Sequence, residues 1–344
     1  MTARKFRIRH ARRPQSVMAG PAERGALVSI VICNHNREHY LGSAIDSALR
    51  QSHAPTEVVV IDDGSTDGSP ALIRAYGDRI RAVLKRGAGQ PSAINAGFRE
   101  SRGEIICLLE ADDRFAPDKV ARLAGIFARN PDAGWIFHEL GYIDGAGREI
   151  PLRLLENRAQ ARAVLRRQRR YGAFSHVDLR DRFAAGERLP YACPGFSALS
   201  FRRHVLDAIL PMPEDIARAG DEFPKFAALA LFPGIHLGDC LAQQRIHDAD
   251  ASAFSDTATD SAERVLKTAY HLRHRYGHIA PSTDKWFASS FGRLLGVMGP
   301  SATMASVETK RYLKDYFGPL TWMRQGPRIV YHAARGRLGG AVRR

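Results

Sequence analysis

The amino-acid sequence predicts an α/β protein with a Rossmann-like, mostly parallel sheet and flanking helices, followed by a helical C-terminal extension. Two observations carry this prediction. Between residues 27 and 130, short apolar runs alternate four times with amphipathic helical patterns, as is typical of a doubly wound sheet. Beyond residue 257, apolar residues recur only with helical spacing.

The first strand and helix form the clearest pair. Residues 27–33 are a run of strand length that is apolar except for one serine. Apolar residues then recur at i, i+3, i+4, i+7 and i+8, which is one face of a helix. They are Leu41, Ala44, Ile45, Ala48 and Leu49.

Three further pairs follow. The predicted strands cover residues 58–61, 79–85 and 104–109. The predicted helices are a short one through Leu72 and Ile73, one over residues 90–100, and one that begins near Pro117, because proline suits the first turn of a helix.

After residue 133 the alternation is less regular. We predict strands over residues 134–143 and 195–201, a helix near 203–210, and a helix through Phe226, Leu229 and Leu231. The arginine-rich stretch 152–185 is expected to be an inserted helical or loop segment.

Composition excludes several classes of protein. The chain has 344 residues, of which 44% are hydrophobic and 25% charged, as expected for a globular protein. No window approaches the roughly 18 consecutive apolar residues of a membrane-spanning helix. The four cysteines form no CxxC pair and no Cys/His cluster, so we expect neither a disulfide framework nor a zinc site. The N-terminus lacks the apolar stretch of a secretory signal, so we expect a cytoplasmic protein.

Positive charge is concentrated at both ends of the chain. The formal net charge is +15, and the runs 4–13 and 324–344 each carry six Lys or Arg residues and no acid. A third basic run covers residues 153–170. Such runs attract anionic membranes or nucleic acids, although many are only solvated surfaces. Of these partners an anionic membrane is favoured and nucleic acid is unlikely.

Acidic residues follow two of the predicted strands. Asp62, Asp63 and Asp67 follow the second strand, and Glu110, Asp112 and Asp113 follow the fourth. Ligands bind at the carboxyl ends of strands in open α/β sheets, and clustered carboxylates favour a hard cation such as Mg²⁺ or Mn²⁺. Each segment alone is more typical of a turn or a helix cap than of a ligand site.

Taken in order, four segments are more specific than any one of them. They are residues 28–36 (VSIVICNHN), 58–67 (VVVIDDGSTD), 89–97 (GQPSAINAG) and 108–113 (LLEADD). This series resembles the family 2 glycosyltransferases, which have the GT-A fold and bind nucleotide sugars. A weaker resemblance extends to about residue 250, and nothing in the last 90 or so residues belongs to it.

The resemblance implies a set of donor-binding residues. Asn36 would lie beside the nucleotide, Asp62 or Asp63 would accept hydrogen bonds from the base or ribose, and Asn95 would line the pocket. Arg245 and His247 match a basic element near the diphosphate of the donor.

The resemblance also implies the catalytic residues. Asp112 and Asp113 match the acids that hold Mn²⁺ or Mg²⁺ and contact the ribose, with Glu110 beside them in the donor site. Asp221 falls where such enzymes carry the catalytic base, and Glu222 is its close competitor. The reaction implied is an inverting transfer, in which an acceptor hydroxyl attacks the anomeric carbon as the nucleoside diphosphate leaves.

The sequence departs from the family pattern at three positions. Cys33 replaces a proline, His35 replaces a common tyrosine, and Glu110 stands where Asp is typical, which puts its direct contact with ribose or metal in doubt. The Q-x-x-R-W signature of processive members is missing, so we expect transfer of a single sugar to a glycan or lipid-linked acceptor.

On this basis we expect three regions. Residues 1–24 would be a flexible basic arm, and residues 257–344 a basic helical extension. Residues 25–256 would be the GT-A domain, with a nucleotide-binding half (25–130) and an acceptor half (131–256) that contains an insertion at 152–190. The extension, which combines Trp322, Ile329 and Val330 with arginines, either packs on this domain or lies on the inner face of the cytoplasmic membrane.

Three other classes of protein compete with this interpretation. A NAD-dependent dehydrogenase or a sugar-phosphate nucleotidyltransferase needs a glycine-rich first loop, and residues 33–37 contain no glycine. The remaining alternative is a non-catalytic, basic nucleic-acid-binding or scaffolding protein that keeps the fold.

Overall fold

The structure is a computed structural model that describes residues 25–155, 167, 170–187, 194–216, 221–246 and 258–341. The chain divides into two compact units. The α/β unit takes in residues 1–178, 190–214 and 224–247, and the helical unit takes in residues 179–189, 215–223 and 248–344.

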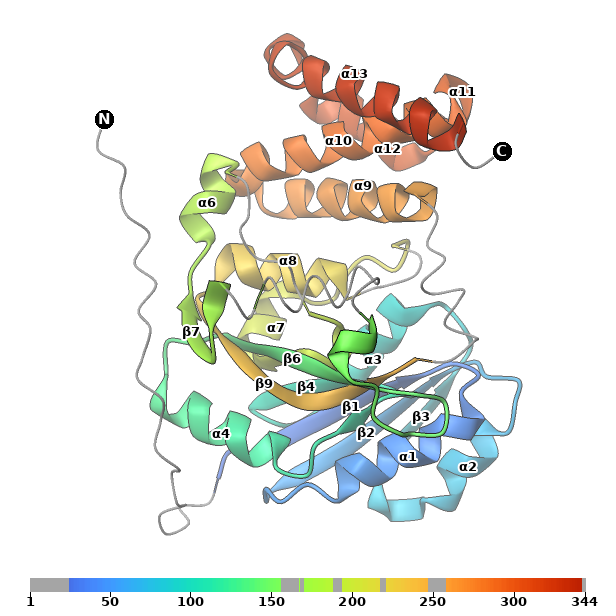
Figure 1. Cartoon of the computed structure of the whole chain (residues 1–344), viewed down its shortest axis with the longest axis vertical. Helices are drawn as coiled ribbons and strands as arrows, with labels where there is room; N and C mark the ends of the chain where they lie inside the picture. Colours follow the sequence, from blue (N-terminus) through green and yellow to red (C-terminus); the bar gives the residue numbers. More distant parts are fainter. Residues whose placement is uncertain are drawn as a thin grey trace. The chain divides into compact units, whose positions relative to one another are not determined.

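The α/β unit begins with the four predicted strands and helices. The strands are β1 (Val28–Asn34), β2 (Thr56–Asp63), β3 (Arg81–Lys85) and β4 (Ile105–Glu110). They are parallel and lie in the order β3-β2-β1-β4 (Figure 1). The helices are α1 (Glu38–Leu49), α2 (Ser69–Ala75), α3 (Gln90–Glu100) and α4 (Lys119–Arg129), with a 3-10 turn η1 (Gly77–Arg79). The doubly wound prediction is confirmed.

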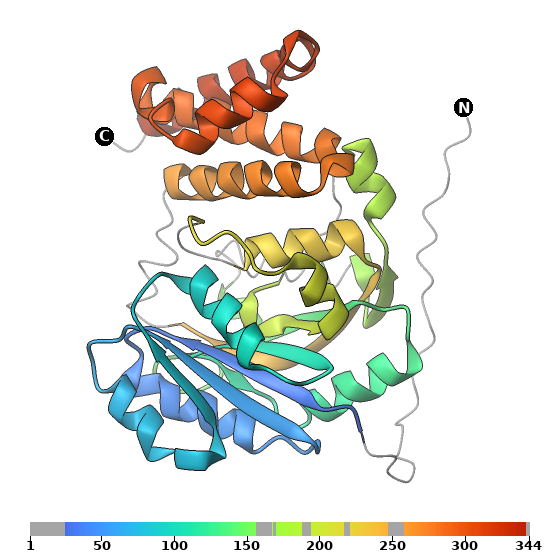
Figure 2. The ribbon, with the colours of Figure 1, turned by 180° about the vertical axis from the view of Figure 1, so that it is seen from behind.

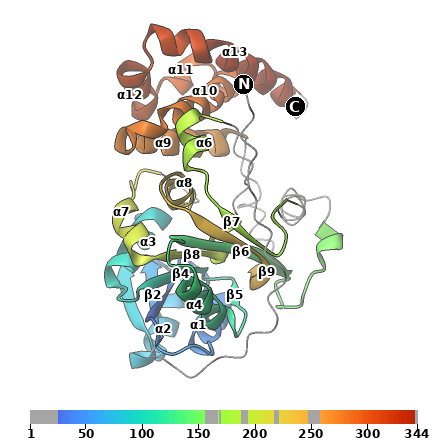
Figure 3. The same cartoon turned by 90° about the vertical axis from the view of Figure 1, so that its left-hand side faces the viewer.

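Alternate residues of β1 face opposite helical layers. Ile30 and Ile32 are fully buried in one cluster with Leu41 and Ile45 of α1. Val31 points to the other face, where a Cβ on Gly97 of α3 would lie 2.3 Å from its Cγ1. Helices therefore cover both faces of the sheet, with α1 and α2 opposite α3 (Figure 3), which explains why β1 is an unbroken apolar run.

The sheet continues beyond β4 in mixed orientation. Its further strands are β5 (Arg114–Phe115), β6 (Trp135–Ile143), β7 (Phe174–Val177), β8 (Leu199–Arg202) and β9 (Gly234–Arg245). β8 is antiparallel to β4 and β6, and β9 is parallel to β6 and antiparallel to β5 and β7. The remaining elements are η2 (Leu152–Leu155), η3 (Phe196–Ala198), α7 (Arg203–Ile209) and α8 (Glu222–Leu231).

Two expectations for this half were wrong. The segment 152–185 is not only helical or loop, because β7 adds a strand to the sheet within it. Residues 195–201 begin with the 3-10 turn η3 before the strand β8. The strand β9 was not predicted, since polar residues such as His236 and Gln243 interrupt its apolar pattern and its register with β6 shifts at Glu139.

The helical unit contains α6 (Arg180–Ala185), α9 (Ala258–Arg275), η5 (Gly277–Ile279), α10 (Ala280–Met298), α11 (Pro300–Thr303), α12 (Val307–Tyr316) and α13 (Pro319–Ala341). Helices α9 to α13 are the orange and red helices of Figure 2. Its core is aromatic: the rings of Phe287 and Tyr312 stack with centroids 3.9 Å apart, and Phe291 and Phe317 join the same cluster. The predicted helical pattern beyond residue 257 is confirmed.

Helices α10 and α13 touch through glycine. A Cβ on Gly292 would lie 2.4 Å from the carbonyl oxygen of Ile329, and one on Gly296 would lie 2.2 Å from that of Ala333. Only a glycine allows backbones to approach so closely. Helix α13 is therefore fixed to α10 through its main chain. None of the helices in the described part of the chain is both long enough and apolar enough to cross a bilayer.

Candidate active site

The loops after β1, β2 and β4 are joined by side-chain hydrogen bonds within the α/β unit. Asn34 at the end of β1 donates from Nδ2 to Oδ1 of Asp62 at the end of β2, over 2.7 Å. Arg37 in the next turn donates from Nε to Oδ2 of Asp112, after β4, over 3.0 Å. Parallel strands place their carboxyl ends at one edge, so the acids predicted from the sequence gather at this edge.

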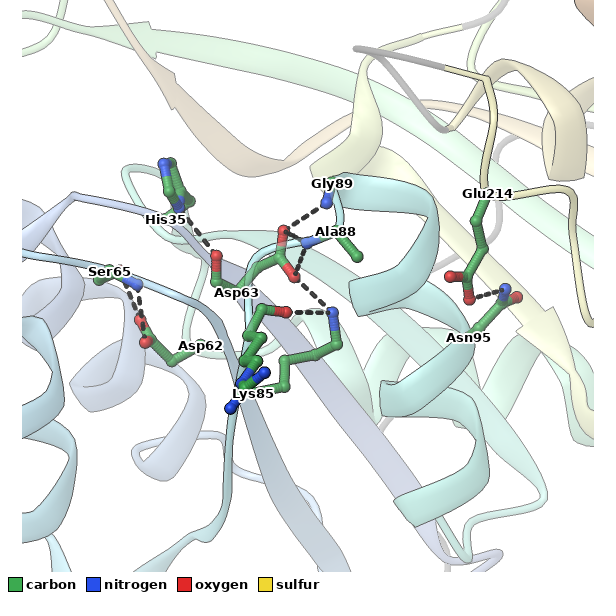
Figure 4. Close-up of polar contacts among 10 residues, drawn as sticks. His35, Asp62, Asp63, Ser65, Lys85, Ala88, Gly89, Asn95 and Glu214 are labelled. Carbon is green, nitrogen blue, oxygen red and sulfur yellow. Dashed lines mark hydrogen bonds and ion pairs between the residues drawn. The ribbon is translucent and has the colours of Figure 1, made fainter.

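Asp62 holds its own loop together. Its carboxylate accepts hydrogen bonds from Asn34, from the Ser65 backbone NH over 3.1 Å and from the Ser65 hydroxyl over 2.5 Å. Figure 4 shows Asp62 beside Ser65. The residue is 2% exposed. The carboxylate is thus engaged by three donors of the protein, and its contact with a base or ribose stays a prediction.

Asp63 is held in the same way by a different segment. Nζ of Lys85 lies 2.5 Å from its Oδ1, and the backbone NH of Gly89 donates to Oδ2 over 2.6 Å (Figure 4). The NH of Ala88 adds a further hydrogen bond. Gly64 follows with φ of +76°, and a Cβ there would lie 2.5 Å from the Gly87 nitrogen. Asp63 therefore fixes the segment that leads into α3.

Asn36 is exposed and adopts a left-handed backbone conformation, with φ of 52°. Its Oδ1 accepts from the Thr66 NH over 2.8 Å, and its own NH donates to the Ser65 hydroxyl over 2.8 Å. Nδ1 of the neighbouring His35 lies 2.9 Å from the carbonyl oxygen of Asp63 (Figure 4). These contacts place Asn36 on the surface between the first two loops.

Asp113 lies behind the loop that carries Asp112. It is 3% exposed; Oδ2 accepts from the Ser197 hydroxyl over 2.5 Å, and Oδ1 accepts from the backbone NH of Arg245 over 2.9 Å. The Asp112 side chain is 15% exposed. Of the two predicted metal ligands, Asp112 is thus the one that reaches the surface.

The neighbouring Glu110 is positioned from two sides. Its Oε1 accepts from the Gln90 side chain over 2.7 Å, and its backbone NH donates to the Ser197 hydroxyl over 3.1 Å. Ser197 therefore contacts both Glu110 and Asp113. A single serine from η3 fixes the position of the acidic loop relative to the sheet.

A buried lysine supports this serine. Nζ of Lys119 donates to the carbonyl oxygen of Ser197 over 2.7 Å and lies 3.4 Å from the centroid of the Phe115 ring. Lys119 is fully buried. Burial lowers its pKa to about 7, against the opposing influence of Cys107 and Asp113.

Arg245, at the end of β9, contacts the loop that carries Asp112 and Asp113. Its Nε donates to the carbonyl oxygen of Asp112 over 2.8 Å, and one terminal nitrogen donates to the carbonyl oxygens of Asp144 and Gly145. The guanidinium carbon lies 4.8 Å from the centroid of the Tyr40 ring. The diphosphate contact of Arg245 stays a prediction, and His247 lies outside the described residues.

Asn95 contacts a distant part of the chain. Its Oδ1 accepts from the Met212 NH over 2.8 Å, and its Nδ2 donates to the Met212 carbonyl oxygen over 2.9 Å. The Nδ2 also donates to Oε1 of Glu214 over 3.1 Å (Figure 4). The residue is 3% exposed. These bonds hold residues 212–214 against α3, and a role in lining the donor pocket is untested.

The two candidates for the base belong to the helical unit. Asp221 precedes α8 and is 7% exposed. Glu222 begins α8, and its Oε1 lies 3.8 Å from Nε of Arg264. Their catalytic role remains a prediction from the sequence.

The residues at the strand ends fit a divalent cation only in part. Within the described ranges, no group of three or more His, Cys, Asp or Glu side chains is arranged to hold a metal ion. Magnesium is commonly held by one or two carboxylates together with the phosphates of a substrate. Asp112 fits that description, whereas both carboxylate oxygens of Asp113 already accept hydrogen bonds.

Sequence reasoning assigned no role to several residues that shape this site. They are Arg37, Lys85, Gln90, Lys119 and Ser197. Gln90 lies inside a segment that matched the family pattern, and Arg37 directly follows another. Their positions in or beside these segments could have marked Gln90 and Arg37 as site residues. Their partners could not be predicted, because Glu110 lies 20 residues from Gln90 and Asp112 lies 75 residues from Arg37.

This sheet, with acids at the ends of its parallel strands, defines a glycosyltransferase of the GT-A type. The model of glycosyl transferase family 2 matches residues 29–200, half of the chain. The chain belongs to glycosyl transferase family 2.

Several curated proteins are similar to this chain. An uncharacterized glycosyltransferase of Nostoc sp. is 29% identical over 254 residues, 72% of this chain and 74% of that protein. The succinoglycan biosynthesis protein ExoO of Rhizobium meliloti is 41% identical over 28% of each chain. The undecaprenyl-phosphate 4-deoxy-4-formamido-L-arabinose transferase of Pseudomonas paraeruginosa is 34% identical over 38% of this chain and 40% of its own.

Solved structures confirm the expected fold. TarS of S. aureus, residues 1–349 in complex with UDP-GlcNAc, has a TM-score of 0.55 at 14% identity and covers 90% of both chains. The mannosyltransferase PcManGT of Pyrobaculum calidifontis, in complex with GDP-Man and Mn²⁺, has a TM-score of 0.51 at 18% identity, over 95% of this chain and 90% of its own.

Proposed function

We propose that this glycosyltransferase moves a single sugar from a nucleoside-diphosphate sugar to a hydroxyl group of a glycan or lipid-linked acceptor, with inversion at the anomeric carbon. The observation that carries the proposal is the ion pair between Arg37 and Asp112. It holds a partly exposed carboxylate at the strand-end edge where ligands bind in α/β sheets.

The relatives support the choice of product. The names of the Rhizobium and Pseudomonas proteins refer to a polysaccharide and to an undecaprenyl-phosphate sugar transfer. Both matches cover less than half of each chain. A role in the synthesis of a cell-surface polysaccharide or glycoconjugate, at the inner face of the cytoplasmic membrane, is therefore part of the proposal.

We assign donor binding to the surface between the loops. Asn36, exposed between the first two loops, and Glu110, fixed by Gln90, would contact the nucleoside of the donor. Asp62 and Asp63 would act mainly by fixing the loops, because protein donors already engage their carboxylates. Arg245, with His247 near it in sequence, would lie near the diphosphate.

Asp112 would hold a divalent cation, Mn²⁺ or Mg²⁺, together with oxygens of the diphosphate. Such a cation neutralises the negative charge that develops on the leaving group. Asp113 would support Asp112 from behind through the backbone, since its own oxygens are bonded to Ser197 and Arg245.

The acceptor hydroxyl must lose its proton as it attacks. A carboxylate within hydrogen-bond reach can accept that proton, a contribution of about 10²–10⁴-fold. We assign this role to Asp221, with Glu222 as the alternative. Glu222 lies beside Arg264, with Oε1 3.8 Å from its Nε.

A donor screen tests the proposal. The full chain would be heated with UDP-, GDP- and dTDP-sugars, each with and without Mn²⁺, and its melting temperature recorded. We expect one nucleotide to stabilise the protein only when the cation is present. Stabilisation by none of them, together with salt-sensitive binding to RNA, would favour the non-catalytic alternative.

A further inference from the structure

The outer face of α13 combines exposed apolar side chains with arginine. Ten large apolar side chains are exposed in the described part of the chain, and five of them lie on this helix. Leu320 is 68% exposed, Met323 76%, Val330 69% and Tyr331 56%. A folded protein seldom leaves so many large apolar groups together in water, and such a patch marks an interaction surface.

Four exposed residues of α13 form one apolar stripe along the helix. Leu320, Met323, Pro327 and Tyr331 follow each other at steps of three or four residues and are all exposed. Gln325 and Ile329 point the opposite way, are buried, and lie on the side that contacts α10. The packing of the helical unit therefore uses one face of α13 and leaves a second apolar face without a partner in the described structure.

A basic stripe runs beside the apolar one. Arg324, Arg328 and Arg335 recur at steps of four and seven residues, and Arg335 donates a hydrogen bond to the Tyr331 hydroxyl over 3.2 Å. Residues 316–344 contain six arginines and no Asp or Glu. Helices with this arrangement lie in the plane of a bilayer, with apolar side chains among the acyl chains and cations at the headgroups.

We propose that the outer face of α13 binds the surface of a membrane that contains anionic lipids. This inference deepens the membrane location that is part of the proposed function, but it does not rest on the donor site, because no residue of that site takes part in it. A membrane with anionic lipids complements both stripes of α13. Its anionic headgroups match the basic stripe, and its acyl chains match the apolar one. A second copy of the chain fits poorly, because a symmetric pair would bring these arginines together with no acid from residues 316–344 between them.

Flotation of the full chain with lipid vesicles tests this proposal. We compare vesicles of phosphatidylcholine alone with vesicles that contain 30% phosphatidylglycerol. The intact protein should float with the anionic vesicles. Deleting α13 is unsuitable, because its inner face packs on α10; substitutions on its outer face leave that packing unchanged.

Two double variants separate the stripes. Leu320→Ser with Met323→Ser should reduce binding more than tenfold, because each side chain loses its transfer into the acyl region. Arg324→Gln with Arg335→Gln should reduce binding to anionic vesicles about 25-fold, at roughly fivefold per arginine. The control is Leu154→Ser in the α/β unit, since Leu154 is also 68% exposed and should leave binding unchanged.

Several outcomes would overturn the proposal. They are a wild-type protein that does not float, an apolar double variant that floats as well as wild type, or a lipid-free dimer that the same variant dissociates. Complete loss of vesicle binding in 0.5 M salt would indicate a purely electrostatic surface, as for nucleic acid. Donor-induced stabilisation is measured without lipid, so failure of the proposed function would be seen separately.

Discussion

The hydroxyl of Ser197 donates a hydrogen bond to Oδ2 of Asp113 over 2.5 Å, although the two residues lie 84 positions apart in the chain. The hydroxyl oxygen of Ser197 also accepts a hydrogen bond from the backbone NH of Glu110 over 3.1 Å. One side chain therefore fixes two acids of the candidate site. Its removal should therefore change the site, although Ser197 itself has no assigned contact with the donor.

Ser197→Ala should lower the rate of sugar transfer by about 10- to 100-fold, the usual effect of losing a group that orients a metal-binding carboxylate. Initial rates of nucleoside diphosphate release would measure it. Ser200→Ala is the matched control, because Ser200 is equally buried but its hydroxyl donates to the Cys107 sulfur over 3.4 Å and not to an acid of the candidate site. Equal loss in both variants would indicate a general packing defect.

Asp112→Asn should abolish the cation-dependent part of donor binding. The variant keeps the size of the side chain but removes the charge that a divalent cation requires. Thermal stabilisation by donor, with and without Mn²⁺, would measure the effect. Asp239→Asn breaks a different aspartate–arginine pair, with Arg122, and should behave as wild type. An unaltered response to Mn²⁺ in Asp112→Asn would remove Asp112 from the site.

Asp221→Asn should reduce turnover by about 10²–10⁴-fold while donor affinity stays nearly intact, because a general base acts only on the acceptor. Glu222→Gln should have the smaller effect on turnover. Steady-state rates and donor-induced stabilisation, measured on the same preparations, separate the two properties. Equal loss of both in Asp221→Asn would place the base elsewhere.

The stability of the protein should rise between pH 7 and pH 10 through Lys119. Burial lowers the pKa of Lys119 to about 7 in the folded state, whereas a lysine of the unfolded chain titrates near 10.4. In this interval the unfolded state binds one more proton, so the free energy of unfolding increases with pH. Urea unfolding of Lys119→Met should show a flatter dependence; an identical slope would contradict this.

Gly97→Ala should destabilise the α/β unit by about 1–3 kcal/mol, the usual cost of overpacking a buried contact. The added Cβ would lie 2.3 Å from Cγ1 of Val31, so β1 or α3 must shift. Gly77→Ala is unsuitable as a control, because Gly77 has φ of +54°; Gly326→Ala meets no atom within 4 Å and should cost little. Thermal or urea unfolding would compare the two.

Three of the four strands in the first half of the fold, β1, β2 and β4, are mostly buried and could be predicted from their apolar runs, whereas β3 at the end of the sheet is partly exposed. Residues 28–34 of β1 are all buried, so the strand is almost entirely apolar. Strand β9 is different, since its His236, Asp239 and Gln243 make contacts with other elements. No local pattern distinguishes such a strand from a loop.

The sequence predicted where the acids of the candidate site lie in the sheet, but not which protein groups contact their carboxylates. The order of the motifs indicated that Asp62, Asp63, Asp112 and Asp113 belong to strand ends of one sheet. It did not indicate which carboxylates the protein itself engages. Asp63 is engaged by Lys85, Asp113 by Ser197 and Asp112 by Arg37. Each of these partners is distant in sequence from the acid it contacts, so the local sequence pattern does not reveal the pair.

The glycines of α10 have a consequence for how the protein can change over generations. Because Gly292 and Gly296 hold α13 by its backbone, folding places little constraint on the outward side chains of that helix. Substitutions at Leu320, Met323 or Val330 can alter what the helix adheres to without weakening the fold. Surface attachment and sugar chemistry are then free to evolve separately within one polypeptide.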